Sequence, residues 1–371
     1  MLKNGNLGDE EVKRVLQLTG DLLKKQGRVS TVISIYRKLY KDVIFDFAVS
    51  DNVDISLKNE IESLGGRVFI LNGKNSIIKI RNFIRKLLAN NDYDYVHYHA
   101  ISMWGCVQDI VKENNVTLIT ESHSATFSEN KIKRLRNKIF SANISKYTDK
   151  RVAVSPEAGE NLFGKKEFTY IPNWIDCKKF CYKETYREQV RKKLGIPQND
   201  IVIGQVGRIN TNKNQLFSLK VFKRILSNNG DYHLIFIGEG TSKEKNRLLK
   251  FIDKHNVDNI HFIDYTEKIE RFYSAFDILW MPSHFEGLPT VSLEANSSGI
   301  PVILSETITR EADVGNDVFL PLKEIMWERE TYRLVSSNRK TKDQVLNDFK
   351  NSVFNEQRVI SKWKELYGLN H

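Results

Sequence analysis

Short apolar runs alternate along the chain with stretches in which apolar residues recur every three or four positions. In the first half, runs with the length and composition of buried strands are found at 12–18, 43–49, 68–71, 93–98, 116–120 and 152–155. Helical periodicity occupies intervals between them, at 27–39, 55–64, 76–88 and 158–163. Strands separated by helices in this way form βαβ units, which predict a parallel sheet and an α/β fold.

The same alternation restarts in the second half. Strand-like runs are found at 201–206, 233–238, 260–263, 277–281, 301–304 and 318–320, with helical patterns at 214–226 and 243–255 between them. The segment 170–176, YIPNWID, has Pro and Asn after a strand, which indicates a turn. We therefore predict two Rossmann-like, doubly wound domains that face a cleft, one at 1–172 and one at 173–355. An amphipathic helix ends the chain at 356–369.

The composition suits two globular domains in a chain of 371 residues, of which 40% are apolar. No stretch of 18 uncharged apolar residues is present, and the polar, acidic N-terminus does not resemble a signal peptide. We therefore expect a cytoplasmic protein, which could attach peripherally to the inner face of the membrane. Three cysteines cannot all pair, and Cys177 and Cys181 lack a second pair or a nearby His, so we expect free thiols and no zinc site there.

The formal net charge of +11 leaves nucleic acid, an anionic membrane and phosphorylated ligands open as partners. Part of the positive charge lies in 128–146, SENKIKRLRNKIFSANISK, a helical pattern with one apolar face. Two interpretations remain open for this segment. It is either an ordinary surface helix or a patch that rests on anionic lipid or a lipid-linked acceptor.

Active sites in parallel sheets lie beyond the carboxyl ends of the strands. In the first domain this rule selects the segments 19–27, 97–99 and 121–123. His99 and His123 end two strands and are expected to face the cleft, while His97 is expected to be buried within its strand. Single histidines are usually structural, so the pair is a stronger signal than either residue alone.

The strongest chemical signal is the stretch 284–301, which holds two carboxylates, Glu286 and Glu294, with seven residues between them. Pro289 favours the first position of a helix, so Glu286 is placed on a loop and Glu294 in the second helical turn. Free N–H groups at that helix start can bind phosphate. Glu294 could then accept the hydroxyls of a ribose, and Glu286 those of a second sugar.

Two cations accompany these acids. Arg208 follows a strand that ends in Gly207, and Lys213 precedes a helix that starts near Asn214. Cations and a helix N-terminus at the carboxyl end of a strand suit a diphosphate. The segment Gly238-Glu239-Gly240 follows another strand and lets the backbone approach a ligand closely.

These stretches, in this order, resemble the retaining, GT-B-fold glycosyltransferases of family four, in the branch that builds capsular and extracellular polysaccharides. The stretches that carry the resemblance are LQLTGDLLKKQGRVSTVISIYRKL, VHYHA, ESHS, RVAVSPEAGENLFG, YIPNWID, VGRINTNKNQ, LIFIGEG and HFEGLPTVSLEANSSGIPVI. Departures from the family pattern are Gln26-Gly27, where a Gly pair is common, and Trp174, where a small residue is usual.

The resemblance implies a nucleotide-sugar donor, most commonly a uridine diphosphate sugar, and a glycan or lipid-linked acceptor. It implies that no metal or other cofactor is needed, because the Arg/Lys pair and a helix dipole take the charge of the leaving group. It also implies that the last helix braces the first domain. The residues expected to act in catalysis are His123, Arg208, Lys213 and Glu286. Those expected to bind the donor are Gly27, Gly207, Arg208, Lys213, Gly238, Glu239, Glu286, Gly287, Leu288, Pro289, Thr290 and Glu294.

Two other functions compete with this one. The chain could be a non-catalytic sugar-nucleotide-binding subunit of a glycosyltransferase complex, although the acids and cations of the second domain are intact. It could also bind nucleic acid, which would show a steep salt dependence. No stacking-aromatic or helix-turn-helix pattern supports the latter, so we expect no nucleic-acid partner.

Overall fold

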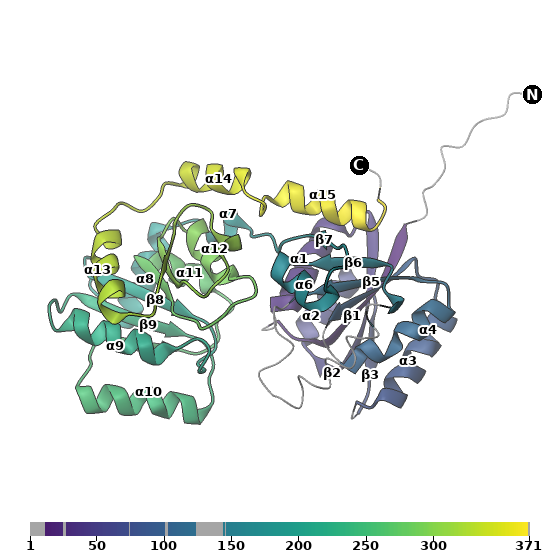
Figure 1. The fold of residues 1–371 in the computed structure, drawn as a ribbon, viewed down its shortest axis with the longest axis horizontal. Coiled ribbons are helices and arrows are strands. Elements are labelled where there is room, and N and C mark those ends of the chain that lie inside the picture. The colour runs from purple at the N-terminus through teal and green to yellow at the C-terminus, as the bar shows by residue number, and fades with distance from the viewer. Residues whose placement is uncertain are drawn as a thin grey trace, which may run out of the picture. The chain divides into compact units, whose positions relative to one another are not determined.

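The chain divides into two compact units, each built on one parallel sheet with helices packed around it (Figure 1). Unit 1 comprises Met1–Pro172 and Gln357–His371, and unit 2 comprises Asn173–Glu356. The computed structural model describes residues 12–24, 27–73, 75–100, 103–123, 144 and 146–369. The α/β fold class predicted from the sequence is confirmed.

The sheet of unit 1 has seven strands in the order β3-β2-β1-β4-β5-β6-β7, and all its neighbouring pairs are parallel. The strands are β1 (Lys13–Leu22), β2 (Val43–Val53), β3 (Val68–Leu71), β4 (Tyr95–Ala100), β5 (Thr117–Ser122), β6 (Lys150–Ala153) and β7 (Thr169–Tyr170). The strand order reverses between β1 and β4. Ligands of doubly wound sheets bind beyond the carboxyl ends of the strands at such a reversal.

The helical segments described in the N-terminal part of unit 1 are α1 (Gly27–Leu39), α2 (Ile55–Ser63), α3 (Ile77–Ala89), η1 (Met103–Val107), α4 (Gln108–Glu113) and α6 (Pro156–Phe163). Side chains cap the helices where the sequence predicts their starts. Ser76 accepts a hydrogen bond from the backbone N–H of Lys79, and Asp54 accepts one from Ser56. Helices η1 and α4 were not predicted from the sequence.

Successive side chains of β4 point to opposite faces of the sheet, and the two faces differ in polarity. Val96 and Tyr98 point into an apolar core that includes Ile80 and Ile84 of α3. The intervening residues, His97 and His99, therefore point to the opposite face of the sheet. The C-terminal segment closes over that second face.

Helix α15 (Glu356–Leu366) and the residues that follow it belong to unit 1. The buried ring of Tyr367 packs edge-on against Phe45 of β2 and Tyr95 of β4, with centroids 5.4 and 5.7 Å away. Lys13 Nζ donates to the carbonyl oxygen of Gly368 at 2.8 Å, and Lys362 Nζ donates to that of Tyr170 at 2.8 Å. The end of the chain therefore completes the first unit.

The sheet of unit 2 has six parallel strands in the order β10-β9-β8-β11-β12-β13. They are β8 (Ile201–Val206), β9 (Tyr232–Ile237), β10 (Ile260–Ile263), β11 (Ile278–Met281), β12 (Val302–Ser305) and β13 (Asp317–Leu320). Successive residues of β11 enter different apolar clusters, Ile278 on one face and Leu279 on the other. Burial on both faces explains why these strands are continuous apolar runs in the sequence.

The helical segments of unit 2 are α7 (Cys177–Phe180), α8 (Glu184–Leu194), α9 (Gln215–Leu226), α10 (Ser242–His255), α11 (Ile269–Ala275), α12 (Thr290–Ser297), η2 (Arg310–Ala312), α13 (Glu324–Val335) and α14 (Lys342–Asn351). One predicted detail is wrong. Pro289 is the N-cap of α12 and not its first helical residue, although Glu286 and Glu294 still lie before and within the helix. Helices α7, α8, α13 and α14 were not predicted from the sequence.

Two predictions concern residues outside the described part of the chain. The basic segment 128–146 lies outside it except for residues 144 and 146, and Gln26 of the first loop lies outside it as well. Within the residues that the structure describes, no helix is long and apolar enough to cross a membrane.

Candidate functional site

Two glycines let the loops after β8 and β9 meet at the carboxyl edge of the sheet of unit 2. Gly207 has a φ of +139° and Gly238 a φ of +149°, a region that side chains strongly disfavour. A Cβ on Gly238 would lie 2.2 Å from the carbonyl oxygen of Gly207. The two loops also meet at a β-bridge between Ile209 and Gly240. Only glycine therefore permits this contact, which leaves the side chains of Arg208 and Glu239 exposed at the same edge.

Asn212 ties the loop after β8 to the loop before α12. Its carbonyl oxygen accepts from the N–H of His284 at 2.9 Å, and its side-chain amide donates to the carbonyl of Phe285 at 3.0 Å. The N–H of Phe285 returns a hydrogen bond to Asn212 Oδ1 at 3.2 Å. These bonds place Lys213 beside Glu286, and Lys213 Nζ lies 2.6 Å from Glu286 Oε1.

The Lys213–Glu286 ion pair is mostly buried, with side chains that are 18% and 15% exposed. The backbone of Lys213 is fixed separately, because its N–H donates to Asn210 Oδ1 at 2.8 Å and its carbonyl accepts from Gln205 Nε2 at 2.7 Å. A phosphate that binds Lys213 must therefore compete with a carboxylate. A hydroxyl that binds Glu286 must likewise compete with an ammonium group.

Glu294 lies on α12 with its carboxylate against a buried tyrosine. The hydroxyl of Tyr273, on α11, donates to Glu294 Oε2 at 2.6 Å. Burial raises the pKa of Glu294 to about 7, although the hydrogen bond from Tyr273 acts in the opposite direction. Burial also raises the pKa of Tyr273 well above its usual value, so this residue stays a hydrogen-bond donor. Glu294 keeps a partly exposed side chain through which a ligand could reach it.

Asp317 anchors the other side of α12. Its carboxylate accepts from the hydroxyl of Ser292 at 2.8 and 2.9 Å and from Asn296 Nδ2 at 2.8 Å. Ser292 and Asn296 are one helical turn apart, so a single carboxylate holds one face of the helix. Burial raises the pKa of Asp317 to about 7. This anchor fixes the orientation in which α12 presents Glu294.

The loop between the two acids leads directly into α12. The N–H of Thr290 donates to the carbonyl of Leu288 at 2.9 Å, and Pro289 is buried at the helix start. Gly287 and Leu288 remain partly exposed, and Leu288 packs against the small apolar cluster that contains Leu293. The predicted phosphate-binding residues therefore form one continuous turn between Glu286 and Glu294.

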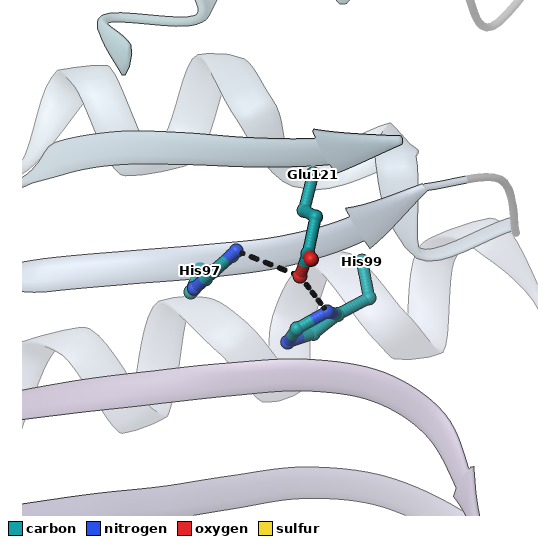
Figure 2. Close-up of side chains that lie close together, drawn as sticks. All are labelled: His97, His99 and Glu121. Atoms are coloured by element: carbon teal, nitrogen blue, oxygen red, sulfur yellow. Dashed lines mark ion pairs between the residues drawn. The ribbon is translucent and has the colours of Figure 1, made fainter. Parts of the chain in front are cut away.

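In unit 1, three side chains from two neighbouring strands converge (Figure 2). His97 and His99 are alternate residues of β4, and Glu121 of β5 pairs in register with His99. Glu121 Oε2 lies 2.9 Å from His99 Nδ1 and 3.4 Å from His97 Nε2. His123 joins them, with its Nε2 3.1 Å from Glu121 Oε2 and 2.9 Å from His99 Nδ1.

The outer nitrogens of the two β4 histidines have their own partners. His99 Nε2 lies 2.8 Å from Gln17 Oε1 of β1, and His97 Nδ1 lies 2.7 Å from the hydroxyl of Tyr367. Gln17 Nε2 also donates to that hydroxyl, at 3.3 Å. Residues from three strands and the end of the chain therefore form one buried polar cluster.

Burial affects the protonation of this cluster. It lowers the pKa of His97 and lowers that of His99 well below its usual value. Burial alone would raise the pKa of Glu121, but the charge of His123 and the adjacent imidazoles hold it well below its usual range. The expectation that His97 is buried is confirmed. His99 is also buried, contrary to the expectation that it faces an open cleft, because Gln17 and Glu121 enclose its ring.

His123 is the least enclosed member of the cluster, with a side chain that is 11% exposed. Gly27 is the exposed first residue of α1, just beyond the loop that follows β1. The predicted residues of unit 1 thus lie at or near the carboxyl ends of β1, β4 and β5, as the rule for parallel sheets requires.

Comparison with known proteins places these residues in context. Residues 186–317 match the family model described as Glycosyl transferases group 1. Over 93% of its length the chain is 26% identical to the capsular polysaccharide biosynthesis glycosyltransferase CapH of Staphylococcus aureus, of which it covers 96%. The chain is a glycosyltransferase, and its residues 186–317 are similar to the group 1 family.

This glycosyltransferase is also 26% identical, over 76% of its length, to the UDP-Gal:alpha-D-GlcNAc-diphosphoundecaprenol alpha-1,3-galactosyltransferase of Escherichia coli, and covers 77% of that protein. Its fold is similar to that of Anabaena Alr3699/HepE, solved in complex with UDP. The TM-score is 0.76 at 16% identity, over 96% of this chain and all of the other. That likeness establishes the GT-B fold.

Sequence reasoning missed several residues that shape the two sites of this glycosyltransferase. Asp317 opens a short strand, and its role depends on a contact with a helix far away in the sequence. Tyr273 looks like any apolar helix residue until its hydroxyl is seen beside Glu294. Glu121 had a signal, because it follows a predicted strand and is two residues from His123.

Proposed function

We propose that this glycosyltransferase moves a sugar from a UDP-sugar to a glycan or lipid-linked acceptor in the synthesis of a surface polysaccharide, with retention of anomeric configuration. The observation that carries the proposal is the pairing of Lys213 with Glu286 on two loops tied by Asn212, next to the helix that presents Glu294. This arrangement puts a cation for phosphate and two carboxylates for hydroxyls at one edge of one sheet. The names of the capsular and diphosphoundecaprenol relatives support the acceptor class.

In the proposed complex, Arg208 and Lys213 contact the diphosphate, together with the backbone of the turn 287–290 and the start of α12. Cationic and N–H donors stabilise the negative charge that develops on the departing phosphate. Glu294 accepts the ribose hydroxyls, and Glu286 accepts hydroxyls of the transferred sugar. We expect transfer to need no metal at the diphosphate, because these groups already supply positive charge there.

The proposed reaction breaks the bond between the anomeric carbon and the diphosphate oxygen. The acceptor oxygen forms the new bond on the same face of the sugar, and its proton passes to the departing phosphate. His123 would lie near the anomeric carbon, as the family resemblance implies, and Gly27 would approach the phosphates. Because the uridine diphosphate leaves intact, its release measures every turnover, including hydrolysis.

A panel of nucleotide sugars tests this proposal. The purified chain should release UDP from at least one UDP-sugar, and Glu286→Gln should lower that rate by about 10²- to 10³-fold, as the loss of one charge-stabilising contact commonly does. Asp258→Asn, a change of an exposed acid in the same unit, is the matched control and should leave the rate unchanged. If no nucleotide sugar turned over while several bound, the chain would instead be a sugar-nucleotide-binding accessory subunit.

A further inference from the structure

In the cluster of unit 1, one ring nitrogen of neutral His99 faces a carboxylate oxygen without a proton between them. Glu121 Oε2, His99 Nδ1 and His123 Nε2 form a triangle with sides of 2.9, 2.9 and 3.1 Å. Because the amide of Gln17 donates to Tyr367, its oxygen faces His99 and accepts the proton of His99 Nε2. His99 Nδ1 then carries a lone pair, and this lone pair lies 2.9 Å from a carboxylate oxygen.

Other atoms of the cluster are also unsatisfied. Among the described residues, Glu121 Oε1 has no hydrogen-bond partner, and His97 Nε2 has none closer than Glu121 Oε2 at 3.4 Å. All of these atoms are buried, with Glu121 only 1% exposed and His97 fully enclosed. A buried acceptor without a donor costs about 1–3 kcal/mol. A positive charge at the centre of the cluster would remove that cost.

The spacing of the four atoms fits a metal ion. Ligands at about 2.0–2.1 Å from a tetrahedral Zn²⁺ lie roughly 3.3 Å from one another. Glu121 Oε2 lies 2.9 to 3.4 Å from one nitrogen of each of the three histidines, and His99 Nδ1 lies 2.9 Å from His123 Nε2. The donor atoms of His97, His99 and Glu121 all lie within 4.8 Å of one another. We propose that His97, His99, Glu121 and His123 form a Zn²⁺ site.

The surroundings are those of a metal site. Histidine ligands usually direct the second ring nitrogen to an outer hydrogen-bond partner, and here Gln17 and Tyr367 take that position for His99 and His97.

Zinc suits the donor set better than the common alternatives. Three imidazoles and one carboxylate are typical Zn²⁺ ligands, while Mg²⁺ and Ca²⁺ prefer oxygen-rich sites. The spacing of two residues in both His-x-His and Glu-x-His brings the ligands to one face of two neighbouring strands. The site lies in unit 1, and it shares no residue with the proposed diphosphate contacts. A metal on Nε2 of His123 would fix that ring and leave Nδ1 to meet a substrate.

Metal analysis of the full-length, tag-free protein tests the site directly. After expression with zinc and dialysis, we expect one zinc per chain by elemental analysis. Replacement with Co²⁺ should produce the visible absorption bands of a tetrahedral site. A strong chelator should remove the metal and lower the melting temperature, and Zn²⁺ should restore it. Because these readouts need no donor sugar, they are independent of the proposed transferase activity.

Variants locate the metal within the protein. Glu121→Gln and His99→Gln should abolish Zn²⁺ binding. Tyr367→Phe removes the hydroxyl that contacts His97 Nδ1 and should weaken Zn²⁺ affinity by about 10- to 100-fold. His233→Gln is the matched control, because His233 belongs to another histidine pair, with His261 in unit 2, and should keep the full metal content. If wild-type protein took up neither Zn²⁺ nor Co²⁺, or if all variants bound as wild type, the proposal would be overturned.

Discussion

The ion pair between Lys213 and Glu286 leads to a counterintuitive prediction for the product nucleotide. UDP carries a diphosphate for Lys213 but lacks the transferred sugar whose hydroxyls Glu286 would accept. On binding UDP, Glu286 therefore competes with the diphosphate for the ammonium group of Lys213, 2.6 Å away, and gains no new partner. Replacing Glu286 with glutamine removes that competition, and UDP should bind more tightly to the variant than to the wild type.

The expected change in UDP affinity follows from the burial of the Lys213–Glu286 ion pair. Exposed ion pairs contribute about 0.2–1 kcal/mol, and contacting residues show interaction energies of about 0.5–3 kcal/mol. With side chains only 18% and 15% exposed, this pair should lie above the range for exposed pairs and in the middle of the second range, at about 1–2 kcal/mol. Glu286→Gln should then strengthen UDP binding by about 5- to 30-fold.

Titration calorimetry with UDP on four proteins measures this effect: wild type, Glu286→Gln, Lys213→Gln and the double variant. Lys213→Gln should weaken UDP binding. The double variant should bind UDP no more tightly than Lys213→Gln does, because the gain from Glu286→Gln depends on the ammonium group of Lys213. The reasoning is refuted if Glu286→Gln weakens UDP binding as much as Lys213→Gln does. Such a result would mean that Glu286 contacts the nucleotide itself.

Three further predictions concern the support of the site. The affinity for UDP should fall about tenfold per pH unit below 7, because ribose hydroxyls need ionised Glu294, whose pKa is about 7. Tyr273→Phe removes a donor to that carboxylate and should move the transition to higher pH. Asp317→Ala leaves two donors of α12 unpaired and should cost about 1–3 kcal/mol of unfolding free energy, measured with urea. Gly238→Ala should abolish UDP binding, because its Cβ would overlap the adjacent loop.

Controls separate these effects from general damage. Burial favours protonated Glu294 in the folded state, so its contribution to stability is fully present below the unfolded pKa and is lost as pH rises through about 7. Binding and stability should thus respond to pH in opposite directions, and a parallel change would contradict the role of Glu294. For Gly238, the control is Gly230→Ala, a site with no atom within 4 Å of the new Cβ, which should bind UDP normally.

Much of the fold could be predicted from the sequence because parallel strands buried on both faces are continuous apolar runs. The predicted bounds of 201–206 and 260–263 match β8 and β10. Helices α8 and α14 were missed because they are mostly polar, with few buried residues to set a period. Pro289 was misplaced by one residue because proline at the helix start and at the position before it look alike in sequence.

The candidate site could be predicted where a charged or polar side chain comes directly after a strand. Lys213 and Glu286 were selected for the donor from their positions, but their pairing with each other depends on the bonds of Asn212, which no pattern encodes. The burial of His99 was missed for a similar reason. Its enclosure requires Gln17 and a tyrosine at the other end of the chain, and contacts over such sequence distances leave no local signal.

The central claim is that the chain transfers sugar from a UDP-sugar with retention. The most direct measurement is NMR spectroscopy of the product formed from an α-linked UDP-sugar and a diphospholipid or glycan acceptor, with UDP release followed in parallel. The account predicts an α-linked product for wild type and a rate at least about 10²-fold lower for Glu286→Gln. A β-linked product would contradict retention, and the absence of turnover with every nucleotide sugar would contradict the transferase assignment itself.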